Sequence, residues 1–599
     1  MSIGEVEIKK GRAHFLLVSV ASVFLLIATT KTIPLFAWYL GLVALFLAAV
    51  MRPLPRQYSV PGILFLLFCL LLLMHALVFS QSYDEKGIFI PVTLILSFLV
   101  FSSLPPIGPA FRFSLGVTSL IAYAALILLF SGINLGRAHG IFGTANTFAT
   151  YVNLFLAPVL AYYLLGGGGR GLYALLLMLF ATLLATHSRG GDLGLIASMG
   201  LFGVFVGTKV LRSNIQRVLY VVAGFTAISL ALDWLPQLGQ VWLTGIKSAD
   251  NEHLTSPVSM YERIRLYDIA WQVIKENFPN GTGAFTFRYH FERLKGEDWF
   301  NRHNGFVHND YLQIAVENGA VIFSIFMLFI AALYFYTLKN RDRARYENRL
   351  PLVMAVTGIT SMLAHSLVDF PFYGPLFQAT LGASVGIVNR QLLEIGEKSF
   401  RVPAIANFTP TVISRDFVKH LMAVLIFVWL TLPVLAKGAV DYGLDRLRHN
   451  DFQGGVYWHS VARALQPGKF EYYWREGTIW EAVGVTRRDT ELVGLADEMY
   501  AKTALANPMD VTSLLARVQL ARLHSDLLPG RFSRDKMLEW VLRAKKLQPY
   551  SDIIHIEYMR TLLFIGRRQE AIEQAKVLLK WYPNSARAKA LLVEMQGGK

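Results

Sequence analysis

Long apolar runs separated by short polar segments dominate residues 1–436. "FLLVSVASVFLLIA" and "PGILFLLFCLLLLMHALVF" are two of them, and a helix of ~17–25 apolar residues is long enough to cross a bilayer. The first run is not expected to be a cleavable signal peptide, because another apolar run follows at once without a small-residue cleavage site. We predict about thirteen transmembrane helices, with centres near residues 20, 42, 70, 95, 120, 156, 178, 199, 225, 323, 359, 381 and 427.

The pattern changes to that of a soluble helical domain over residues 437–599. Four helical patterns there end at a proline, and another pattern begins after each one: Pro467, Pro508, Pro549 and Pro583. The spacing of 34 residues between the last two matches the tetratricopeptide period, and "GRRQEAIEQAKVLLKWYPNS" fits that repeat. We therefore predict an all-α fold, with a polytopic membrane domain over 1–436 and a tetratricopeptide-like repeat domain over 437–599.

Stacked helix pairs usually present a concave surface to a protein or peptide. The repeats are therefore expected to contact a protein partner. The alternative is that they form a cap that stabilises the membrane domain.

The composition supports a membrane protein. The chain is 54% hydrophobic and 16% charged, whereas about a quarter of the residues of a soluble domain are charged. The net charge of +16 would suggest nucleic-acid binding in a soluble protein, but here the basic residues are explained as topology signals. The single cysteine, Cys69, lies inside an apolar run, so it forms neither an intrachain disulfide nor a cysteine metal site.

The Lys and Arg residues of the short loops predict the orientation of the spans. One set of loops is rich in them and contains Lys9, Lys10, Arg12, Arg52, Arg56, Lys209, Arg212, Arg217 and the stretches 339–349 and 390–419. The alternate loops hold little beyond Lys31, Lys86, Arg137 and Arg189. The basic set is expected to face the cytoplasm, which places a large loop over about 234–310 outside. Residues 437–599 also lie outside if the number of spans is odd, and inside if it is even.

Polar and ionisable residues gather at the predicted outer ends of the spans, where they are costly and therefore candidates for function. In chain order they are "GIFGTANTFATY" with Asn146, "THSRGGDLG" with Arg189, "SMYERIRLYDIAWQVIKE" with Arg263 and Arg265, "NRHNGFVHNDYLQIAVENG" with His308, Asn309, Asp310 and Glu317, and "AHSLVDFPFYGP" with His365 and Asp369. Arginines, a histidine and carboxylates at one surface favour a site for a lipid phosphate, because arginine presents a fork of donors that suits phosphate.

These clusters also have structural explanations. Asn146 would cap the helix that starts there, and Arg189 would pair with Asp192 or extend to the bilayer interface. The stretch His308–Asp310 would form a helix N-cap without chemistry. Glu317 would be buried in or near the membrane if its helix is straight.

Other kinds of chemistry have little support. His365 and Asp369 are four residues apart and share a helical face, but no tight ligand motif such as HExxH occurs, and we expect no metal. No GxxxxGK[ST] occurs either, so we expect no nucleotide cofactor. "GGGGR" (166–170) is interpreted as a flexible linker, and "PNGTGAF" as a turn that ends the outer-loop helix. The alternative for "PNGTGAF" is that its backbone N–H groups bind phosphate.

Five of these pieces resemble motifs of the bacterial O-antigen ligase and polymerase superfamily: "GIFGTANTFATY", "THSRGG", "ERIRLYDIAWQVIKENFPNGTG", "HNDYLQIAVENG" and "HSLVDFPFY". They occur in family order over about residues 137–375. The superfamily comprises lipopolysaccharide O-antigen ligases, polysaccharide polymerases and protein O-oligosaccharyltransferases. The resemblance implies a helical, GT-C-like membrane glycosyltransferase that moves glycan from an undecaprenyl-diphosphate carrier to an acceptor. The transfer would occur at the periplasmic face of the inner membrane, without metal or nucleotide sugar.

The resemblance also implies roles for particular residues. Arg189 matches the arginine of the Ser-Arg-Gly motif, and Arg263 matches the outer-loop arginine, with Arg265 as the alternative; these would bind the carrier diphosphate. His308 matches the histidine of the His-Asn motif and would take the proton of the acceptor hydroxyl, or orient that hydroxyl. Asp310 is the alternative base. The remaining polar residues are expected to support the site: Asn146, Asn309, Glu317, His365 and Asp369.

The resemblance leaves the branch open. Ligases often have a closely spaced His-x-His-Asn, whereas the earlier histidine here, His303, is five residues before His308. The acceptor would be lipid A–core, a growing polysaccharide, or a protein Ser or Thr. The length, the repeats and "HSLVDFPFY" favour polymerases and protein oligosaccharyltransferases over plain ligases.

Two functions of other classes compete with glycan transfer. A transporter or flippase for lipid-linked glycan would need polar residues through the span centres, and those centres are largely apolar. A non-catalytic scaffold that presents the repeats would leave the five motifs unexplained.

Overall fold

The structure, a computed structural model, describes residues 3–29, 34–51, 55, 57–80, 84–103, 133–134, 137–138, 142, 144–242, 258–300, 302–343, 346–401, 415–528 and 530–597. The chain is helical almost throughout these residues, which confirms the predicted all-α fold. Strand pairing within them is limited to two short antiparallel pairs, β1 (Gln57–Ser59) with β4 (Ser399–Arg401), and β2 (Ile133–Asn134) with β3 (Arg137–Ala138).

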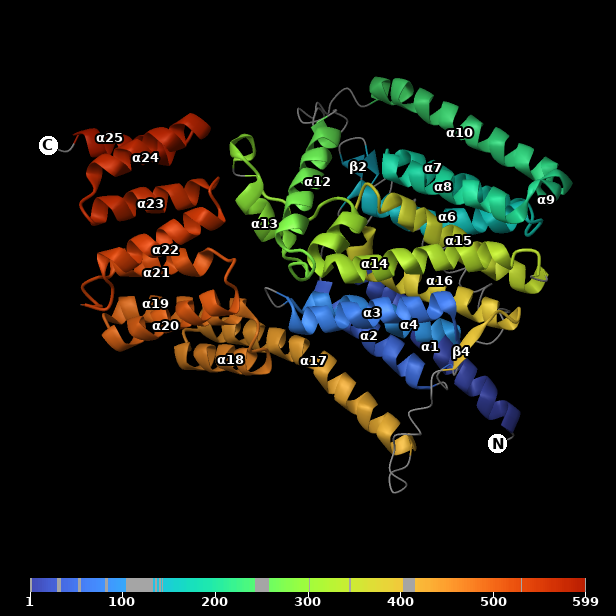
Figure 1. Cartoon of the computed structure of the whole chain (residues 1–599), viewed down its shortest axis with the longest axis horizontal. Coiled ribbons are helices and arrows are strands. Elements are labelled where there is room, and N and C mark those ends of the chain that lie inside the picture. Colours follow the sequence, from blue (N-terminus) through green and yellow to red (C-terminus); the bar gives the residue numbers. More distant parts are fainter. Residues whose placement is uncertain are drawn as a thin grey trace.

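The apolar helices pack side by side in one bundle (Figure 1). They are α1 (Ile3–Thr29), α2 (Pro34–Val50), α3 (Val60–Val78), α4 (Glu85–Ser102), α6 (Ala145–Leu164), α7 (Arg170–Ala185), α8 (Arg189–Val206), α10 (Ile215–Trp242), α14 (Asp310–Lys339), α15 (Tyr346–His365), α16 (Pro375–Glu394) and the first part of α17 (Arg415–Arg448). The short α9 (Thr208–Ser213) links α8 to α10. Helix α4 packs on α16, α3 on α14, and α15 on both α6 and α8, around one continuous apolar core.

Six of the described helices are long and apolar enough to cross a membrane: α3, α4, α6, α8, α14 and the Val424–Arg448 part of α17. Large apolar side chains on them are exposed in the isolated chain, such as Met74 and Val78 on α3 and Phe335 on α14, as expected for surfaces that face lipid. The apolar helices indicate a membrane protein. The expected span centred near residue 120 lies outside the described residues, and the other expected centres fall within helices.

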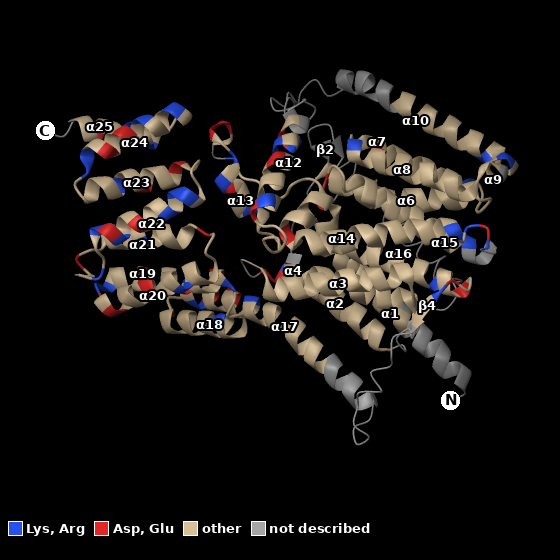
Figure 2. Cartoon of the chain, viewed as in Figure 1, with Lys and Arg blue, Asp and Glu red and all other residues tan. Residues whose placement is uncertain are grey.

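Arginines hold the loops at one end of the bundle, where Figure 2 shows groups of basic residues. Arg217 donates to the carbonyl oxygen of Tyr163 in the last turn of α6 (2.9 Å) and to that of Gly167 beyond the helix (2.7 Å). Arg349 donates to the carbonyl of Val206 at the end of α8 (3.1 Å). Cations are favourable at helix C-termini, which carry partial negative charge. The glycine run at 166–169, expected to be a flexible linker, is therefore anchored by Arg217.

Residues after α17 form a stack of short helices at the other end of the molecule (Figure 1). They are α18 (Phe452–Leu465), α19 (Phe470–Arg487), α20 (Thr490–Ala506), α21 (Thr512–Leu523), α22 (Arg534–Leu547), α23 (Asp552–Phe564), α24 (Arg568–Trp581) and α25 (Ala586–Gly597). Each helix packs on the next. The four prolines lie in turns between helices, so the predicted helix ends are confirmed. We call α18–α25 the repeat stack.

The outer loop contains α12 (Val258–Glu276), α13 (Phe287–Leu294) and a short 3-10 helix, η1 (Glu297–Trp299). Helix α12 is the expected outer-loop helix, and its Ile269, Ala270 and Val273 are buried in a small apolar core of this loop. In Figure 1, α12 and α13 lie between the bundle and the repeat stack.

Helix α14 is broken at Gly319, so the condition of a straight helix, under which Glu317 would lie in or near the membrane, is not met. Gly319 has φ 79° and ψ 177°, and the break leaves backbone groups without partners inside the helix. The "PNGTG" turn supplies those partners: the N–H groups of Thr282 and Gly283 donate to the carbonyls of Val316 (3.1 Å) and Glu317 (2.7 Å). These N–H groups are thus occupied, and the sequence is a turn rather than a phosphate loop.

Glycine is required on both sides of this contact. A Cβ atom on Gly319 would lie 2.3 Å from the carbonyl oxygen of Pro279, and one on Gly281 would lie 2.5 Å from the nitrogen of Gly319. The outer loop is therefore joined to α14 through backbone groups, two and a half turns after the helix begins.

Candidate active site

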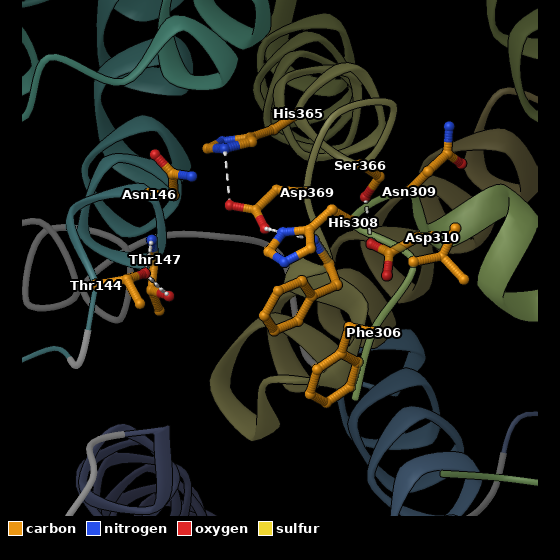
Figure 3. Close-up of polar contacts among 12 residues, drawn as sticks. Thr144, Asn146, Thr147, Phe306, His308, Asn309, Asp310, His365, Ser366 and Asp369 are labelled. Atoms are coloured by element: carbon orange, nitrogen blue, oxygen red, sulfur yellow. Dashed lines mark hydrogen bonds and ion pairs between the residues drawn. The ribbon is translucent and has the colours of Figure 1, made fainter. Parts of the chain in front are cut away.

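A row of polar side chains lies where α14 begins and α15 ends (Figure 3). Nδ1 of His308 is 3.3 Å from Oδ1 of Asp369, and Oδ2 of Asp369 is 3.8 Å from Nε2 of His365. Nδ1 of His365 is in turn 2.9 Å from the hydroxyl of Thr150 on α6. The side chain of His308 is 31% exposed and that of His365 is 1% exposed, so His308 is the histidine that a substrate can reach.

The start of α14 holds His308 in place. Asn309 caps the helix, because its Oδ1 accepts from the N–H of Leu312 (3.0 Å), and its Nδ2 donates to the carbonyl of Leu367 (2.9 Å). His308 has φ 57°, a left-handed conformation that is uncommon for residues other than glycine. The hydroxyl of Tyr267 on α12 lies 3.2 Å from the carbonyl oxygen of His308 and steadies this conformation.

Asp310 is buried behind the helix start. Its Oδ2 accepts from the hydroxyl of Ser366 (2.7 Å) and the N–H of Phe372 (3.0 Å), and its own N–H donates to the carbonyl of Ser366 (2.9 Å). These bonds tie α14 to the segment that follows α15. The side chain is only 2% exposed, so the geometry favours a structural role over the expected role as an alternative base.

Asp369 is negatively charged, as a partner that stabilises a protonated His308 must be. Burial raises its pKa, but the hydrogen bond with His308 and the field of nearby groups, including Arg263, outweigh this effect, and the pKa is lowered overall. Asp369 is therefore a carboxylate at neutral pH. A carboxylate at one ring nitrogen fixes the orientation of an imidazole and stabilises its protonated form.

Arg189 is the first residue of α8, and the next residue, Gly190, lies against His365. Ser188 caps the helix by accepting from the N–H of Gly191 (3.2 Å). The backbone of Gly190 touches the imidazole of His365 so closely that a Cβ atom there would lie 2.6 Å from Nε2. Arg189 is exposed, and among the described residues it forms no ion pair with Asp192. The backbone at the start of α8 thus lies against His365, and the exposed Arg189 is the residue directly before this contact.

The two outer-loop arginines have different surroundings. Arg265 forms an ion pair with Asp298, donates to the carbonyl of Lys295 (2.9 Å), and lies 4.5 Å above the ring of Trp299. Arg263 has no ion-pair partner among the described residues, and it acts electrostatically on Asp369, His365 and Tyr267. The structure therefore brings Arg263 to the polar row and engages Arg265 inside the loop.

Asn146 lies beside the row but does not cap its helix. The cap of α6 is Thr144, whose hydroxyl accepts from the N–H of Thr147 (3.1 Å), so a cap role for Asn146 is wrong. Asn146 is one turn before Thr150, the partner of His365, and Figure 3 draws it on the same side of His365 as Thr147.

Glu317 supports the helix start from within. Its Oε1 accepts from Nε2 of Gln313 (2.7 Å), and its Oε2 accepts from the hydroxyl of Tyr373 (2.6 Å). Oε1 of Gln313 accepts from the N–H of Val307 (2.6 Å), the residue before His308. Glu317 thus holds the loop of His308 through Gln313.

Aromatic rings form a wall below His308. Phe306 and Phe370 are parallel, with ring centroids 4.2 Å apart, and Phe370 meets the ring of His308 edge-on at 4.9 Å. Tyr373 contacts Phe306 at 5.3 Å. Figure 3 shows Phe306 beneath His308.

Sequence reasoning missed several of these residues. Thr150, Tyr267, Ser366 and Tyr373 all bond to predicted site residues, yet each looks like an ordinary helix or loop residue in the sequence. The i+4 spacing of Asn146 and Thr150 was a signal for one of them. Within the described residues, no group of three or more His, Cys, Asp or Glu is placed to hold a metal ion.

The fold and the site define a polytopic helical membrane protein with a histidine–carboxylate pair and arginines at one end of its bundle. Residues 173–327 match the family model described as O-antigen ligase. The matched segment contains seven of the predicted site residues: Arg189, Arg263, Arg265, His308, Asn309, Asp310 and Glu317. The match agrees with the resemblance found in the sequence and supports glycan transfer in general.

Two other comparisons add little. The comparison with curated proteins found no match. Among solved structures, the chain is similar to one titled "Crystal Structure of the Yeast Tom70", at 12% identity over 71% of this chain and 92% of that chain, with a TM-score of 0.18. A similarity this low carries no argument about this chain.

Proposed function

We propose that this protein transfers a glycan from an undecaprenyl-diphosphate carrier to an acceptor hydroxyl at the periplasmic face of the bacterial inner membrane. The observation that carries the proposal is the His308–Asp369 pair, with Arg263 and the start of α8 beside it. A base and nearby cations are what an inverting displacement of a diphosphate requires. The O-antigen ligase match supports the same class of reaction.

In the proposed reaction the acceptor oxygen forms a bond to the anomeric carbon of the first sugar. The bond between that carbon and the diphosphate oxygen breaks, and its electron pair leaves with the diphosphate. The hydroxyl proton passes to Nε2 of His308, because Nδ1 faces Asp369. Asp369 orients the ring and stabilises the imidazolium, while Arg189 and Arg263 neutralise the leaving group.

The division of the chain is part of the proposal. Residues 1–436 would form the transferase domain, with the outer loop over about 234–310, and 437–599 would form a periplasmic repeat domain that contacts a protein partner or the acceptor. Helix α17 (Arg415–Arg448) runs through the boundary without a break. The acceptor is lipid A–core, a growing polysaccharide or a protein hydroxyl, and the length and repeats favour the last two.

The test uses the purified full-length protein with a synthetic polyprenyl-diphosphate glycan and, in parallel, each of the three acceptor classes. We expect release of polyprenyl diphosphate in step with glycan on one acceptor, and no effect of a chelator on the rate. In proteoliposomes, a flippase would instead move the lipid-linked glycan between leaflets with its diphosphate bond intact. That result, without transfer to any acceptor, would overturn the proposal.

A further inference from the structure

The repeat stack is joined to the outer loop through an aromatic contact. Phe300 follows η1 at the far edge of the loop. Its ring stacks on Tyr582 with centroids 5.5 Å apart, and it lies 6.4 Å from Trp581 and 6.5 Å from His555. Phe300 packs against the apolar core of α23–α25. A residue of the loop thus completes the core of the last repeats.

Two further contacts join the repeat stack to the rest of the protein. Nδ2 of Asn507, in the turn between α20 and α21, donates to the hydroxyl of Tyr289 on α13 (2.8 Å), and both groups are buried. Lys469, before α19, forms an ion pair with Glu85 at the start of α4, where the two side chains are 11% and 9% exposed. A buried charge is costly without its partner, so this pair is a specific contact.

The residues next to Phe300 contact α12, the helix that carries Arg263 and Tyr267. Phe300 directly follows Asp298 and Trp299, which hold Arg265 by an ion pair and by the ring face. Arg265 is two residues from Arg263 on α12, and Tyr267, half a turn further on, contacts the carbonyl of His308. Phe300 is therefore connected to α12 through its neighbours Asp298 and Trp299, which contact Arg265.

The segment between Phe300 and His308 is tied to the same loop. Nζ of Lys295 bonds to Glu292 (2.8 Å) and to the carbonyl of Arg302 (2.8 Å). Nδ1 of His303 lies 2.8 Å from the other oxygen of Glu292. Arg302 and His303, close before His308, are thus bonded to α13 and the residue that follows it, and α13 also contacts the repeat stack.

We propose that the repeat stack is a positioning element for the active site: it holds α12, α13 and the segment leading to His308 in place, and Phe300 is the positioning residue at the contact. The proposal rests on the proposed function for its effect on turnover. Contact between the repeat stack and the loop does not depend on that function. One surface of the repeats is then used by the chain itself, which leaves the remaining surface for a partner.

The test compares full-length Phe300→Ala with wild type by amide hydrogen exchange and by turnover. Exchange is expected to rise in α12, α13 and residues 302–309, and kcat is expected to fall about 10- to 100-fold, because small misplacements of catalytic groups are costly. Phe564→Ala is the matched control, since Phe564 is 42% exposed on α23 of the same stack and should change neither readout.

A double variant distinguishes this contact from a general loss of stability. Tyr582→Ala removes the other side of the stacked pair, so the double variant with Phe300→Ala should be no worse than the more damaging single variant. Additive losses, or wild-type exchange in the loop of Phe300→Ala, would overturn the proposal. Exchange is measured without substrate, so a protein that shows the expected exchange but transfers no glycan would refute the proposed function alone.

Discussion

At the residue scale, the two outer-loop arginines illustrate how surroundings separate similar side chains. Arg263 and Arg265 are equivalent candidates in the sequence, two residues apart on one helix. The folded loop engages Arg265 with Asp298 and Trp299, while Arg263 acts on Asp369. This difference depends on residues 33 positions away in the chain, and no local pattern could predict it.

Substitutions of Arg263, and of Arg189 in the other arginine motif, are therefore expected to have different effects from substitutions of Arg265. Arg189→Ala and Arg263→Ala should each lower kcat/KM by about 10- to 100-fold, the scale of a hydrogen bond to a charged group, and should weaken carrier binding as well. Lysine should rescue either only in part, since it has a point charge but no fork of donors. Binding of polyprenyl-diphosphate glycan and turnover would be measured on the same preparations.

Arg265→Ala is the comparison for these variants. It should loosen the outer loop, seen as faster hydrogen exchange near Trp299, and Arg265→Lys should keep part of the ion pair. If Arg265→Ala abolished carrier binding with an unchanged loop while Arg263→Ala bound normally, the assignment of the two arginines would be reversed.

At the element scale, the sequence predicts where helices begin and end better than how they bend. The apolar runs, the prolines of the tail and the His-Asn-Asp start of α14 are local signals, and the helices follow them. The break at Gly319 depends on a long-range contact with Pro279–Gly283. The pairing of His308 with Asp369 also joins two distant helix ends. The sequence therefore predicts that both residues lie at the outer ends of the spans, but not that they contact each other.

The last repeats contain a histidine that makes their stability depend on pH. Burial, as the largest cause, lowers the pKa of His555 to about 4. Its Nε2 donates to the carbonyl of Pro549 (2.7 Å), and its Nδ1 accepts from Gln574 (2.8 Å). The neutral form therefore fits the fold, whereas a histidine in an unfolded chain has a pKa of about 6.5.

The direction in which stability changes with pH follows from the pKa values of His555 in the folded and unfolded chain. Between about pH 6.5 and pH 4 the unfolded chain binds a proton that the folded chain does not, so stability falls as the pH falls through this window. The loss from His555 is at most about 3.4 kcal/mol for this difference in pKa, at 1.36 kcal/mol per pH unit. Thermal unfolding in detergent from pH 7.5 to 4 should show a smaller loss for His555→Gln than for wild type. Equal losses in both proteins would show that His555 does not contribute.

At the scale of the whole molecule, the starts of α4 and α14, the outer loop and the repeat stack all meet at one end of the bundle (Figure 1). The repeat stack and the outer loop are therefore expected to lie on the same side of the membrane. Basic loops lie at the opposite end of α6 and α8, and basic loops favour the cytoplasm. These contacts support the odd number of spans that the loop charges alone left open.

The side of the repeat stack is measured with fused reporters. A reporter that is active only in the periplasm should be active when fused after Lys599, and a cytoplasmic reporter at the same position should be inactive. The opposite pair of results would place the repeats, and with them the outer loop, in the cytoplasm.

The most direct test of the central claim is the turnover of a folded His308→Ala protein with synthetic polyprenyl-diphosphate glycan and acceptor. The proposed base role predicts a loss of about 10²–10⁴ in kcat, the usual scale for a positioned acid or base, with carrier binding little changed, because the arginines remain in place. Asp268→Asn, at an exposed position on α12, is the control and should keep wild-type turnover. Near-normal turnover by His308→Ala would contradict the account and remove His308 from the mechanism.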